Sequence, residues 1–562
     1  MINAPQPKWI STNPIFLLEI FWGGGTYRFS THPIVIMDGS KAYQFMGGLP
    51  TPEIDIQMES GGLTGEGESI PFQLVFSVDI SDKISKDVFL DGSIGELSYI
   101  FEKEGNPVQD YENRYLIFKG IVSEPIWGHP DKPTGYVEFS LEERIFIEEL
   151  DLLDAIVGTG GRLDVVDLSN EDKSSSSPLA SITTASMVVV NDVHKGKRCP
   201  FVFGRPGFAY SQATMTPRDN KTSPAYLIGV SLSGLVPGFL MVAGHLVDAS
   251  TCKIYDSKGN SDTGSVLSWV NAYGDPFSFV EINNWGTSTP LANVLDDETI
   301  EYWVTWDIGG GYPNPWGEGS LEGGGDIILF LLSLITKDLD YDAFFAAAPI
   351  LNRYKFGGYI NEAISPIAFV ENHILPFLPC SIAIGPNGLK PVLDLEILGD
   401  YLNPSETIIT NESFYRIGPI ETQTDYSDII NQIDFNYAIG GFDKNSQSIR
   451  IEPQKRRAAW FQFSTNYSRQ SEQLFGLRST SITAEYIYDY KTAIQTAKDI
   501  VKRNHKPERT ILYKASPQWG YLWVGDVISL TDSTIHLEKQ PMQIIGKKWD
   551  GTSWEFELKM GI

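Results

Sequence analysis

Near its C-terminal end the chain contains the stretch Tyr486-Ile-Tyr-Asp-Tyr-Lys-Thr-Ala-Ile-Gln-Thr-Ala-Lys-Asp-Ile-Val501. Steps of four, three, four and three residues separate the members of an apolar series, Tyr486, Tyr490, Ala493, Ala497 and Ile500. This spacing places the series on one face of an α-helix. Asp489 can cap the helix, because its carboxylate accepts hydrogen bonds from the free amides of the first turn, and Pro507 stops it. The sequence therefore predicts an amphipathic helix over residues 489–505.

Strands are predicted around this helix. The segment Leu522-Trp-Val-Gly-Asp-Val-Ile-Ser-Leu530 follows it. At the end of the chain Trp554, Phe556, Leu558 and Met560 alternate with charged residues, the pattern of a strand with one buried face. Asp550-Gly551 supplies a hairpin turn before that strand. We therefore expect residues 401–562 to form a C-terminal β-barrel domain, with the apolar face of 486–501 packed against a barrel built from the closing strands.

The first part of the chain is predicted to be all β. Two alternating runs carry this prediction, one at Phe72, Leu74, Phe76, Val78 and Ile80 and the other at Val137, Phe139 and Leu141. Glycine pairs such as Gly47-Gly48 and Gly61-Gly62 separate the strands. Many short strands with glycine turns are typical of a barrel or sandwich. Residues 1–155 are therefore interpreted as an N-terminal β-barrel domain.

The middle of the chain is predicted to hold a linker, a β domain and a helical insertion. A linker with connecting strands is expected over 156–215, because 170–178 is rich in serine and charge. A β domain is expected over 216–311 and a small α+β insertion over 312–400. The predicted strands are 182–190, 239–247, 302–306, 391–397 and 429–439. The predicted helices are 327–335, apolar on all sides and capped by Asp326, then 340–348 and 366–375.

Composition limits the possible functions. The 562 residues carry a net charge of −28, with 42% hydrophobic and 20% charged residues. A chain this acidic repels nucleic acid and anionic membrane, so sequence-specific nucleic-acid binding is disfavoured. Cys199, Cys252 and Cys380 are too few and too widely spaced for a disulfide framework or a zinc knuckle, and any role beyond packing stays open. No segment has the roughly 18 apolar residues of a membrane span, and no signal-peptide core is present.

The same sequence shows no catalytic, cofactor or metal site. The seven histidines never fall four residues apart, as a helical zinc site requires; they are His32, His129, His194, His245, His373, His505 and His536. Gly229-Val-Ser-Leu-Ser-Gly234 resembles a nucleophile elbow, but Ser233 replaces its second glycine. Gly158-Thr-Gly-Gly161 and Gly23-Gly-Gly25 lack the lysine of a phosphate-binding loop and are interpreted as turns. Asp296-Asp-Glu298 is interpreted as a solvated acidic face.

Three groups of segments resemble one family, the tail-tip or baseplate hub proteins of long-tailed, siphophage-like bacteriophages and related tail-like particles. The C-terminal group is Phe475-Gly-Leu-Arg-Ser479, the helix with Ala493 and Ala497, Gly525-Asp526 and Trp549-Asp-Gly551. The central group is Asp340-Tyr-Asp342, Ala347-Ala-Pro-Ile-Leu-Asn352, Gly357-Gly-Tyr-Ile-Asn361 and Ile374-Leu-Pro-Phe-Leu-Pro379. The N-terminal group is Trp22-Gly, Tyr27-Arg-Phe-Ser30 and Gly47-Gly48.

This resemblance implies a non-enzymatic structural protein of the virion, made in the host cytoplasm and located at the distal end of the tail. It implies a homotrimer whose two barrel domains per subunit form a pseudo-sixfold ring around the DNA-passage channel. The implied partners are the distal tail protein, the tape-measure protein and the central fibre, spike or other baseplate proteins. The chain departs from some relatives in having no evident lysozyme or peptidase module and no cysteine cluster.

Two alternatives remain open at this point. One is another component of the same class, a distal tail protein or a different baseplate protein. The other is an acidic carbohydrate-binding or glycoside-hydrolysing β protein, because 13 Trp and 25 Tyr could stack on sugars. A further hypothesis follows from the charge, since a lumen lined with carboxylates would repel passing DNA.

Overall fold

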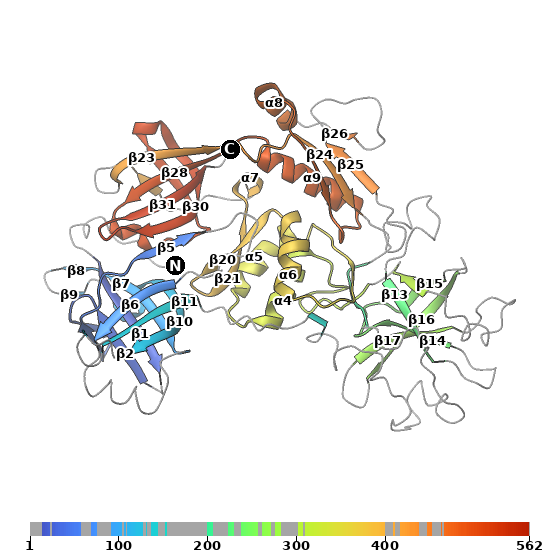
Figure 1. Cartoon of the computed structure of the whole chain (residues 1–562), viewed down its shortest axis with the longest axis horizontal. Coiled ribbons are helices and arrows are strands. Elements are labelled where there is room, and N and C mark those ends of the chain that lie inside the picture. Colours follow the sequence, from blue (N-terminus) through green and yellow to red (C-terminus); the bar gives the residue numbers. More distant parts are fainter. Residues whose placement is uncertain are drawn as a thin grey trace.

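The structure of the chain is a computed structural model. The residues it describes are 14–22, 25–57, 69–75, 92–103, 106–107, 110–127, 131, 136–143, 152–153, 199–205, 223–229, 238–256, 261–270, 276–282, 302–306, 310–398, 408–410, 416–437, 447–451, 462–463 and 466–560. Figure 1 shows two β-sheets side by side at one end, a separate barrel at the other, and helices between them. The prediction of a mainly β, multi-domain protein with a small helical insertion is confirmed.

An eight-stranded N-terminal sheet has the strand order β3-β4-β2-β1-β7-β10-β11-β6. Its strands are β1 (Ile15–Trp22), β2 (Gly25–Ser30), β3 (Ile34–Asp38), β4 (Lys41–Gly47), β6 (Ser69–Val75), β7 (Ile94–Ile100), β10 (Tyr115–Trp127) and β11 (Tyr136–Glu143). Beside it lie the short strands β8 (Glu102–Lys103) and β9 (Asn106–Pro107) and the 3-10 turn η2 (Tyr111–Asn113). Val137, Phe139 and Leu141 are buried, which confirms the alternation predicted there. Residues 76–80 of the other alternating run lie outside the described residues.

A closed six-stranded barrel forms the opposite end of the molecule. Its strands run β13-β14-β17-β16-β15-β18, namely β13 (Ser223–Gly229), β14 (Gly238–Ala243), β15 (Thr251–Asp256), β16 (Ser261–Val270), β17 (Pro276–Ile282) and β18 (Tyr302–Thr305). Strands were predicted over 239–247 and 302–306, and β14 and β18 occupy these places. The strand predicted over 182–190 lies outside the described residues.

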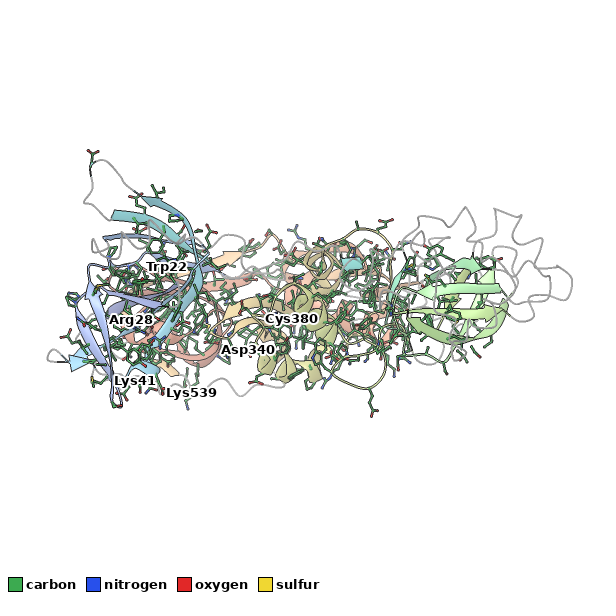
Figure 2. The ribbon with its side chains drawn as sticks, turned by 90° about the horizontal axis from the view of Figure 1, so that it is seen from below. Trp22, Arg28, Lys41, Asp340, Cys380 and Lys539 are labelled. Carbon is green, nitrogen blue, oxygen red and sulfur yellow. The ribbon has the colours of Figure 1, made fainter. Side chains whose placement is uncertain are left out.

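The helices between the sheets form the centre of the molecule. They are α4 (Gly324–Ile335), α5 (Tyr341–Leu351), α6 (Pro366–Phe369) and α7 (Leu395–Leu398), with the π-helical turn η8 (Val370–Ile374) and the 3-10 turn η9 (Leu375–Phe377). Two antiparallel pairs accompany them, β12 (Phe201–Phe203) with β19 (Gly358–Ile360) and β20 (Cys380–Gly385) with β21 (Gly388–Leu393). Figure 2 shows Asp340 and Cys380 in this middle region, and Trp22, Arg28 and Lys41 in the N-terminal sheet.

Three local predictions in this region need correction. Gly323, and not Asp326, is the N-cap of α4; Asp326 lies in the first turn, where its carboxylate suits the positive end of the helix. The helix predicted over 366–375 does not end before Pro376, because the turn η9 continues to Phe377. Pro376 is accommodated because it occupies an early position of that turn, where no backbone amide donor is needed. The strand predicted over 391–397 ends at Leu393 and is followed by α7. The burial predicted for the all-apolar helix is confirmed, since Ile327–Leu332 and Ile335 are buried.

Residues 408–560 build two sheets rather than one. The closing sheet has the order β22-β29-β30-β31-β28-β23, with β22 (Ile408–Thr410), β23 (Arg416–Asp425), β28 (Glu508–Ala515), β29 (Val527–Asp532), β30 (Leu537–Trp549) and β31 (Trp554–Met560). The second sheet has the order β26-β25-β24-β27, with β24 (Gln432–Tyr437), β25 (Gln447–Ile451), β26 (Gln462–Phe463) and β27 (Ser479–Thr483). The turns η10 (Pro517–Tyr521) and η11 (Ser533–Ile535) connect strands of the closing sheet. The predicted hairpin is present, with β30 and β31 joined at Asp550-Gly551.

Helix α9 (Tyr490–Asn504) occupies the stretch where a helix was predicted over 489–505, and α8 (Asn466–Phe475) lies beside it. The Asp489 carboxylate accepts the Thr492 amide at 2.8 Å, so the predicted cap is confirmed. The apolar face was predicted to begin at Tyr486, which is one turn too early, because Tyr486 and Ile487 precede the first residue of the helix.

The packing predicted for this helix is wrong. We expected it to lie against the closing strands, but α9 packs on β24 and β25, as Figure 1 also shows. Its buried residues Ala493, Ala497 and Ile500 share a core with the central helices and with Ile433 and Phe435 of β24. The reason is that the inner face of the closing sheet is already covered by the N-terminal sheet.

Candidate functional site

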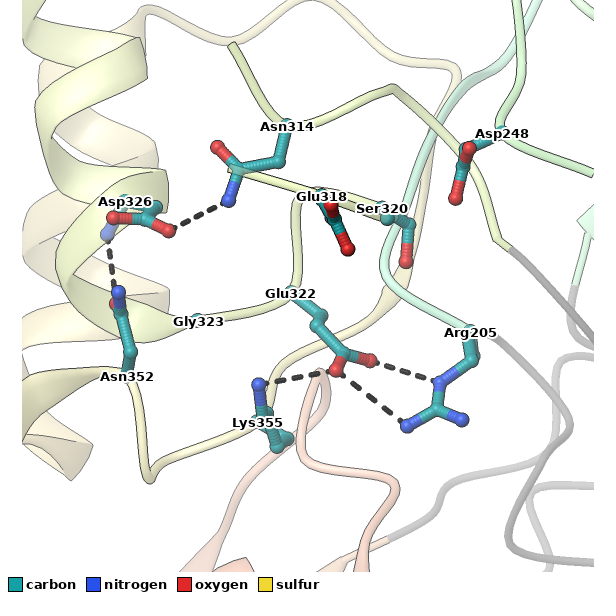
Figure 3. A pocket seen from close by; sticks show the side chains of 11 residues that line it. Arg205, Asp248, Asn314, Glu318, Ser320, Glu322, Gly323, Asp326, Asn352 and Lys355 are labelled. Atoms are coloured by element: carbon teal, nitrogen blue, oxygen red, sulfur yellow. Dashed lines mark hydrogen bonds and ion pairs between the residues drawn. The ribbon is translucent and has the colours of Figure 1, made fainter. Parts of the chain in front are cut away.

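A polar pocket of about 380 Å³ lies where the central helices meet the six-stranded barrel (Figure 3). Its lining is Arg205, Asp248, Asn314, Glu318, Gly319, Ser320, Glu322, Gly323, Asp326, Asn352 and Lys355. The chain brings these residues together from the segment after β12, the loop between β14 and β15, the loop before α4, the first turn of α4 and the loop after α5. Residues distant in sequence thus meet in one mixed-charge hollow.

Glu322 is the centre of this pocket. Its carboxylate accepts from Arg205 Nε at 2.9 Å and from the Tyr488 hydroxyl at 2.7 Å, and pairs with Lys355 Nζ at 3.0 Å. Burial acts to raise the pKa of Glu322, but the Tyr488 hydrogen bond and the charges of Lys355 and Arg205 outweigh it and lower the pKa. Glu322 is therefore held as a carboxylate, and it joins β12, α4, the loop after α5 and the segment before α9.

Three further polar residues of the pocket, Asn314, Asp326 and Asn352, are engaged in local structure. Asp326 accepts from Asn314 Nδ2 at 2.7 Å, and its own amide donates to Asn352 Oδ1 at 3.1 Å. These bonds fix the loop before α4 against the end of α5. The arrangement can hydrogen-bond a polar group from outside; its described lining contains carboxylates, a serine and a lysine but no cysteine or histidine.

The other sequence predictions concern metal sites, glycine-rich or acidic segments, and membrane spans. Within the described ranges, no cluster of three or more His, Cys, Asp or Glu side chains is arranged to hold a metal ion. Several of the segments named in the sequence analysis lie outside those ranges: residues 230–234 of the elbow-like segment, 158–161, 23–24 and 296–298. In the same part of the chain, no helix has the length and apolarity that a bilayer crossing requires.

His245 is the most deeply buried of the described histidines. Its Nε2 accepts the Val202 amide at 2.9 Å, and its Nδ1 lies 2.6 Å from the Leu246 carbonyl, so the proton sits on Nδ1. Burial lowers its pKa to about 4, which keeps the ring neutral. His245 therefore fastens β12 to the barrel.

The three cysteines are free and buried, Cys199 and Cys380 in the central core and Cys252 in the core of the six-stranded barrel. Burial raises the pKa of Cys199 and of Cys252 to about 12 and raises that of Cys380. The thiolate, the reactive form, is therefore disfavoured at all three positions. The Cys199 thiol donates to the Met241 sulfur at 3.0 Å, a packing contact inside the central core.

The N-terminal sheet contains a buried carboxylate that sequence reasoning missed. Glu19 lies opposite Arg28 in the β1–β2 ladder, and Arg28 Nε donates to it at 2.7 Å. The Tyr111 hydroxyl lies 2.8 Å from both Glu19 oxygens, and Arg114 lies 3.2 Å away. Burial, with the Glu19 charge, raises the pKa of Tyr111 to about 12. This cluster fixes η2 on the sheet, and its only sequence signal is the Glu19 and Arg28 pairing across one turn.

The N-terminal and closing sheets meet in an extensive junction at one end of the molecule. Strand β5 (Ile54–Gln57) leaves the N-terminal part and pairs with β30, with Ile54 opposite Trp549. Lys548 Nζ meets Asp55 at 2.8 Å across this pair. The inner faces of both sheets form a single core that contains Phe16, Trp549 and Trp554. A segment near the beginning of the chain thus completes a sheet made near its end.

Lys547 sits inside this junction. Its Nζ donates to the carbonyls of Gly520 at 2.5 Å and Leu522 at 2.9 Å and lies 4.4 Å from the centre of the Trp554 ring. Burial lowers its pKa to about 7, opposed in part by the charge of Asp526. It ties η10 to β30, and η10 in turn contacts β10 of the N-terminal sheet. The sequence does indicate that Lys547 is buried. It lies two residues before the inward Trp549 in the same strand, and residues two apart face the same side of a sheet.

Comparison with known proteins gives structural likenesses only. No protein-family model matches the chain, and no curated protein sequence matches it. Among solved structures, the chain is similar to a tail protein from Neisseria meningitidis, at 10% identity and a TM-score of 0.36 over 97% of this chain and 96% of that one. It is also similar to a prophage tail protein from Listeria monocytogenes, at 12% identity and a TM-score of 0.25 over 64% of this chain and 94% of that one.

A third similar structure comes from the virion of a native gene transfer agent particle. It matches at 9% identity and a TM-score of 0.39 over 67% of this chain and 88% of that one. All three TM-scores lie below one half.

Proposed function

We propose that this chain is a non-enzymatic structural protein of a phage-like virion, the hub at the distal tip of the tail. In this proposal three copies form a ring that continues the tail tube and surrounds the channel through which DNA is ejected. The distal tail protein, the tape-measure protein and a central fibre or spike are its partners.

The observation that supports this proposal best is the shared core of the N-terminal and closing sheets. The sequence resemblance implies two β units per subunit that stand together in a ring, and the two sheets lie side by side at one end of the chain. The β5–β30 pairing and the Lys547 contacts hold them together. The central helices and the six-stranded barrel then extend away from that end, where they are free to meet other tip proteins.

The chemistry of the described residues is consistent with a mechanical role. The charges in the polar pocket hold segments together, and the buried thiols and His245 are kept in their neutral forms. The net charge of −28 suits a channel wall that does not adhere to passing DNA. A ring structure with a neutral or basic lumen would refute that last element alone.

The test is electron microscopy of particles that carry a tagged copy of this chain. We expect label at the distal end of the tail, three copies per particle, and particles without a closed tip when the chain is missing. Label elsewhere on the particle would indicate another baseplate component. Purified protein that cleaves or binds glycans and is missing from particles would refute the proposal.

A further inference from the structure

The polar pocket of Figure 3 holds more negative charge than its own cations balance. Its lining contains two cations, Arg205 and Lys355, and both are directed at Glu322, with Nε and Nζ at 2.9 and 3.0 Å from its carboxylate. We call these three residues the Glu322 cluster. The lining also contains three further carboxylates, Asp248, Glu318 and Asp326. None of the three forms an ion pair within the described ranges. Outside the Glu322 cluster, the pocket therefore presents unbalanced negative charge to a molecule that enters it.

Ser320 gives a second, independent indication of a ligand in this pocket. It is a lining residue that is only 8% exposed, and its side chain points into the hollow (Figure 3). Its hydroxyl has no hydrogen-bond partner among the residues that the structure describes. A buried hydroxyl without a partner is unfavourable, and its oxygen can accept hydrogen bonds through two lone pairs. An N–H donor inside the pocket would therefore gain a hydrogen bond to Ser320.

The hairpin loop that carries two of these acceptors is held by its own backbone. In residues 312–321 the Asn314 amide donates to the Gly319 carbonyl at 2.8 Å, which closes the loop. Glu318 and Ser320 are thus presented from a loop whose path is already fixed. A site whose groups are held in place before binding loses less conformational entropy when a ligand enters, so the arrangement favours binding.

Asp248 approaches this hairpin loop from the barrel, on the loop between β14 and β15. Its amide donates to the Gly311 carbonyl at 2.8 Å, which holds the barrel loop in place. A Cβ atom at Gly319 would lie 3.8 Å from Asp248 Oδ2, so the two loops meet at the pocket. Asp326 lies in the first turn of α4, where Asn314 donates to one of its two oxygens at 2.7 Å. The three carboxylates therefore come from the barrel, the hairpin loop and the central helices.

We propose that this pocket binds an organic cation, with its ammonium or guanidinium group among the three carboxylates and one N–H donated to Ser320. Lysine and arginine side chains of a neighbouring protein carry such groups, and free polyamines carry ammonium groups. An anion would face the three carboxylates, and the net charge of −28 draws cations toward the chain. A bare metal ion fits less well, because no described group of three His, Cys, Asp or Glu side chains is arranged to hold one. This inference goes beyond the proposed function and does not rest on it.

The experiment is ligand-observed NMR, in which saturation is transferred from the full chain to a small probe that binds it. The probes are n-butylammonium and methylguanidinium as cations and acetate as the anion. We expect transfer to both cations and none to acetate. The affinity for the cations should fall as salt rises, because salt screens partly exposed charges. Transfer to acetate in place of the cations would overturn the inference, and so would Ca²⁺ that displaces both cations from the pocket.

Variants separate the pocket from the rest of the acidic surface. Asp248→Asn and Glu318→Gln should each weaken binding of both cations by roughly three- to tenfold, because each removes a charged acceptor. Ser320→Ala should weaken it by roughly twofold or more. Glu421→Gln is the matched control and should leave the affinity unchanged, since Glu421 is an exposed carboxylate on β23. Asp248 and Glu318 are themselves exposed, so their variants should fold, which circular dichroism checks. Equal affinity in the wild type and in both of these variants overturns the inference.

Two further measurements identify the source of the cation. Mass spectrometry of the purified chain after denaturation detects a polyamine that it carries. Carbodiimide treatment of the native assembly couples carboxylates to adjacent lysines, so a product that joins Asp248 or Glu318 to another protein assigns the cation to a lysine side chain. Cation binding by a chain that is missing from particles refutes only the tail role. Unchanged affinity in the pocket variants of a chain that localises to tail tips refutes only this inference.

Discussion

Replacing Lys547 with methionine tests the junction between the two sheets most directly. Methionine retains a long apolar side chain over Trp554 but has neither a charge nor a donor for the Gly520 and Leu522 carbonyls. The ordinary lysine pKa is 10.5, and burial lowers that of Lys547 to about 7. The gap between these values corresponds to roughly 5 kcal/mol of unfolding free energy.

The sign of the effect follows from proton counting. Between about pH 7 and 10.5 the unfolded chain keeps the Lys547 proton while the folded chain releases it, so the unfolded state binds more protons. The stability of the wild type relative to Lys547→Met should therefore rise through this window and stay constant below pH 7. All other titrating groups are shared by the two chains and cancel in the difference.

The assay is urea unfolding followed by tryptophan fluorescence at several pH values from about 6 to 10. Near pH 6 the two chains should differ little, because the variant loses two hydrogen bonds but avoids burying an ammonium group. Near pH 10 the variant should be less stable by several kcal/mol, since two buried carbonyls have lost their donor. Lys548→Met is the control, because Lys548 is exposed beside Asp55 and its pKa is raised. A difference between wild type and K547M that is constant with pH would refute this description of the junction.

Three further substitutions test the remaining contacts. Ile494→Asp places a charge where α9 packs on the central core and should cost several kcal/mol in urea unfolding, whereas Lys491→Asp on its exposed side should cost little. Glu322→Gln should lower stability by about 1–3 kcal/mol at neutral pH. Because the folded pKa of Glu322 is lowered, the wild-type advantage over that variant should disappear as pH falls below the ordinary glutamate range, which thermal melts at pH 3 and pH 7 can check. Ile54→Asp should detach β5 from β30 and speed proteolysis of that segment, an effect that a variant at the exposed Glu53 should not show.

Local features of the fold could be predicted from the sequence because their causes are local. The Asp489 cap, the β30–β31 hairpin and the burial of 327–335 each depend on residues a few positions apart. The partner of α9 could not be predicted in this way. Its apolar face fits any sheet with a free apolar side, and the choice between β24–β25 and the closing strands depends on what covers the latter.

The candidate site was harder to predict for the same reason. Glu322 collects partners that lie 117, 33 and 166 residues away in the sequence, at Arg205, Lys355 and Tyr488. None of these residues belongs to a motif with fixed spacing. Strand β5 makes a contact over an even longer sequence separation, because Lys548 and Asp55 lie 493 residues apart. Two residues had a readable signal, Lys547 through the period-two position shared with Trp549 and Glu19 through its pairing with Arg28 across one turn.

The pairing of β5 with β30 also determines which parts of the chain respond to mechanical force as one unit. A closing sheet made from residues 401–562 alone would leave the Gly546–Trp549 edge of β30 without the partner it has here. An open strand edge pairs readily with other chains, so such a fragment would tend to aggregate. Because β5 comes from the N-terminal part of the chain and pairs with the closing sheet, and because the two sheets share one core, pulling on either end of the chain loads the same body. The barrel and the central helices are then inserted between two halves of that body, and they can engage partners without separating it.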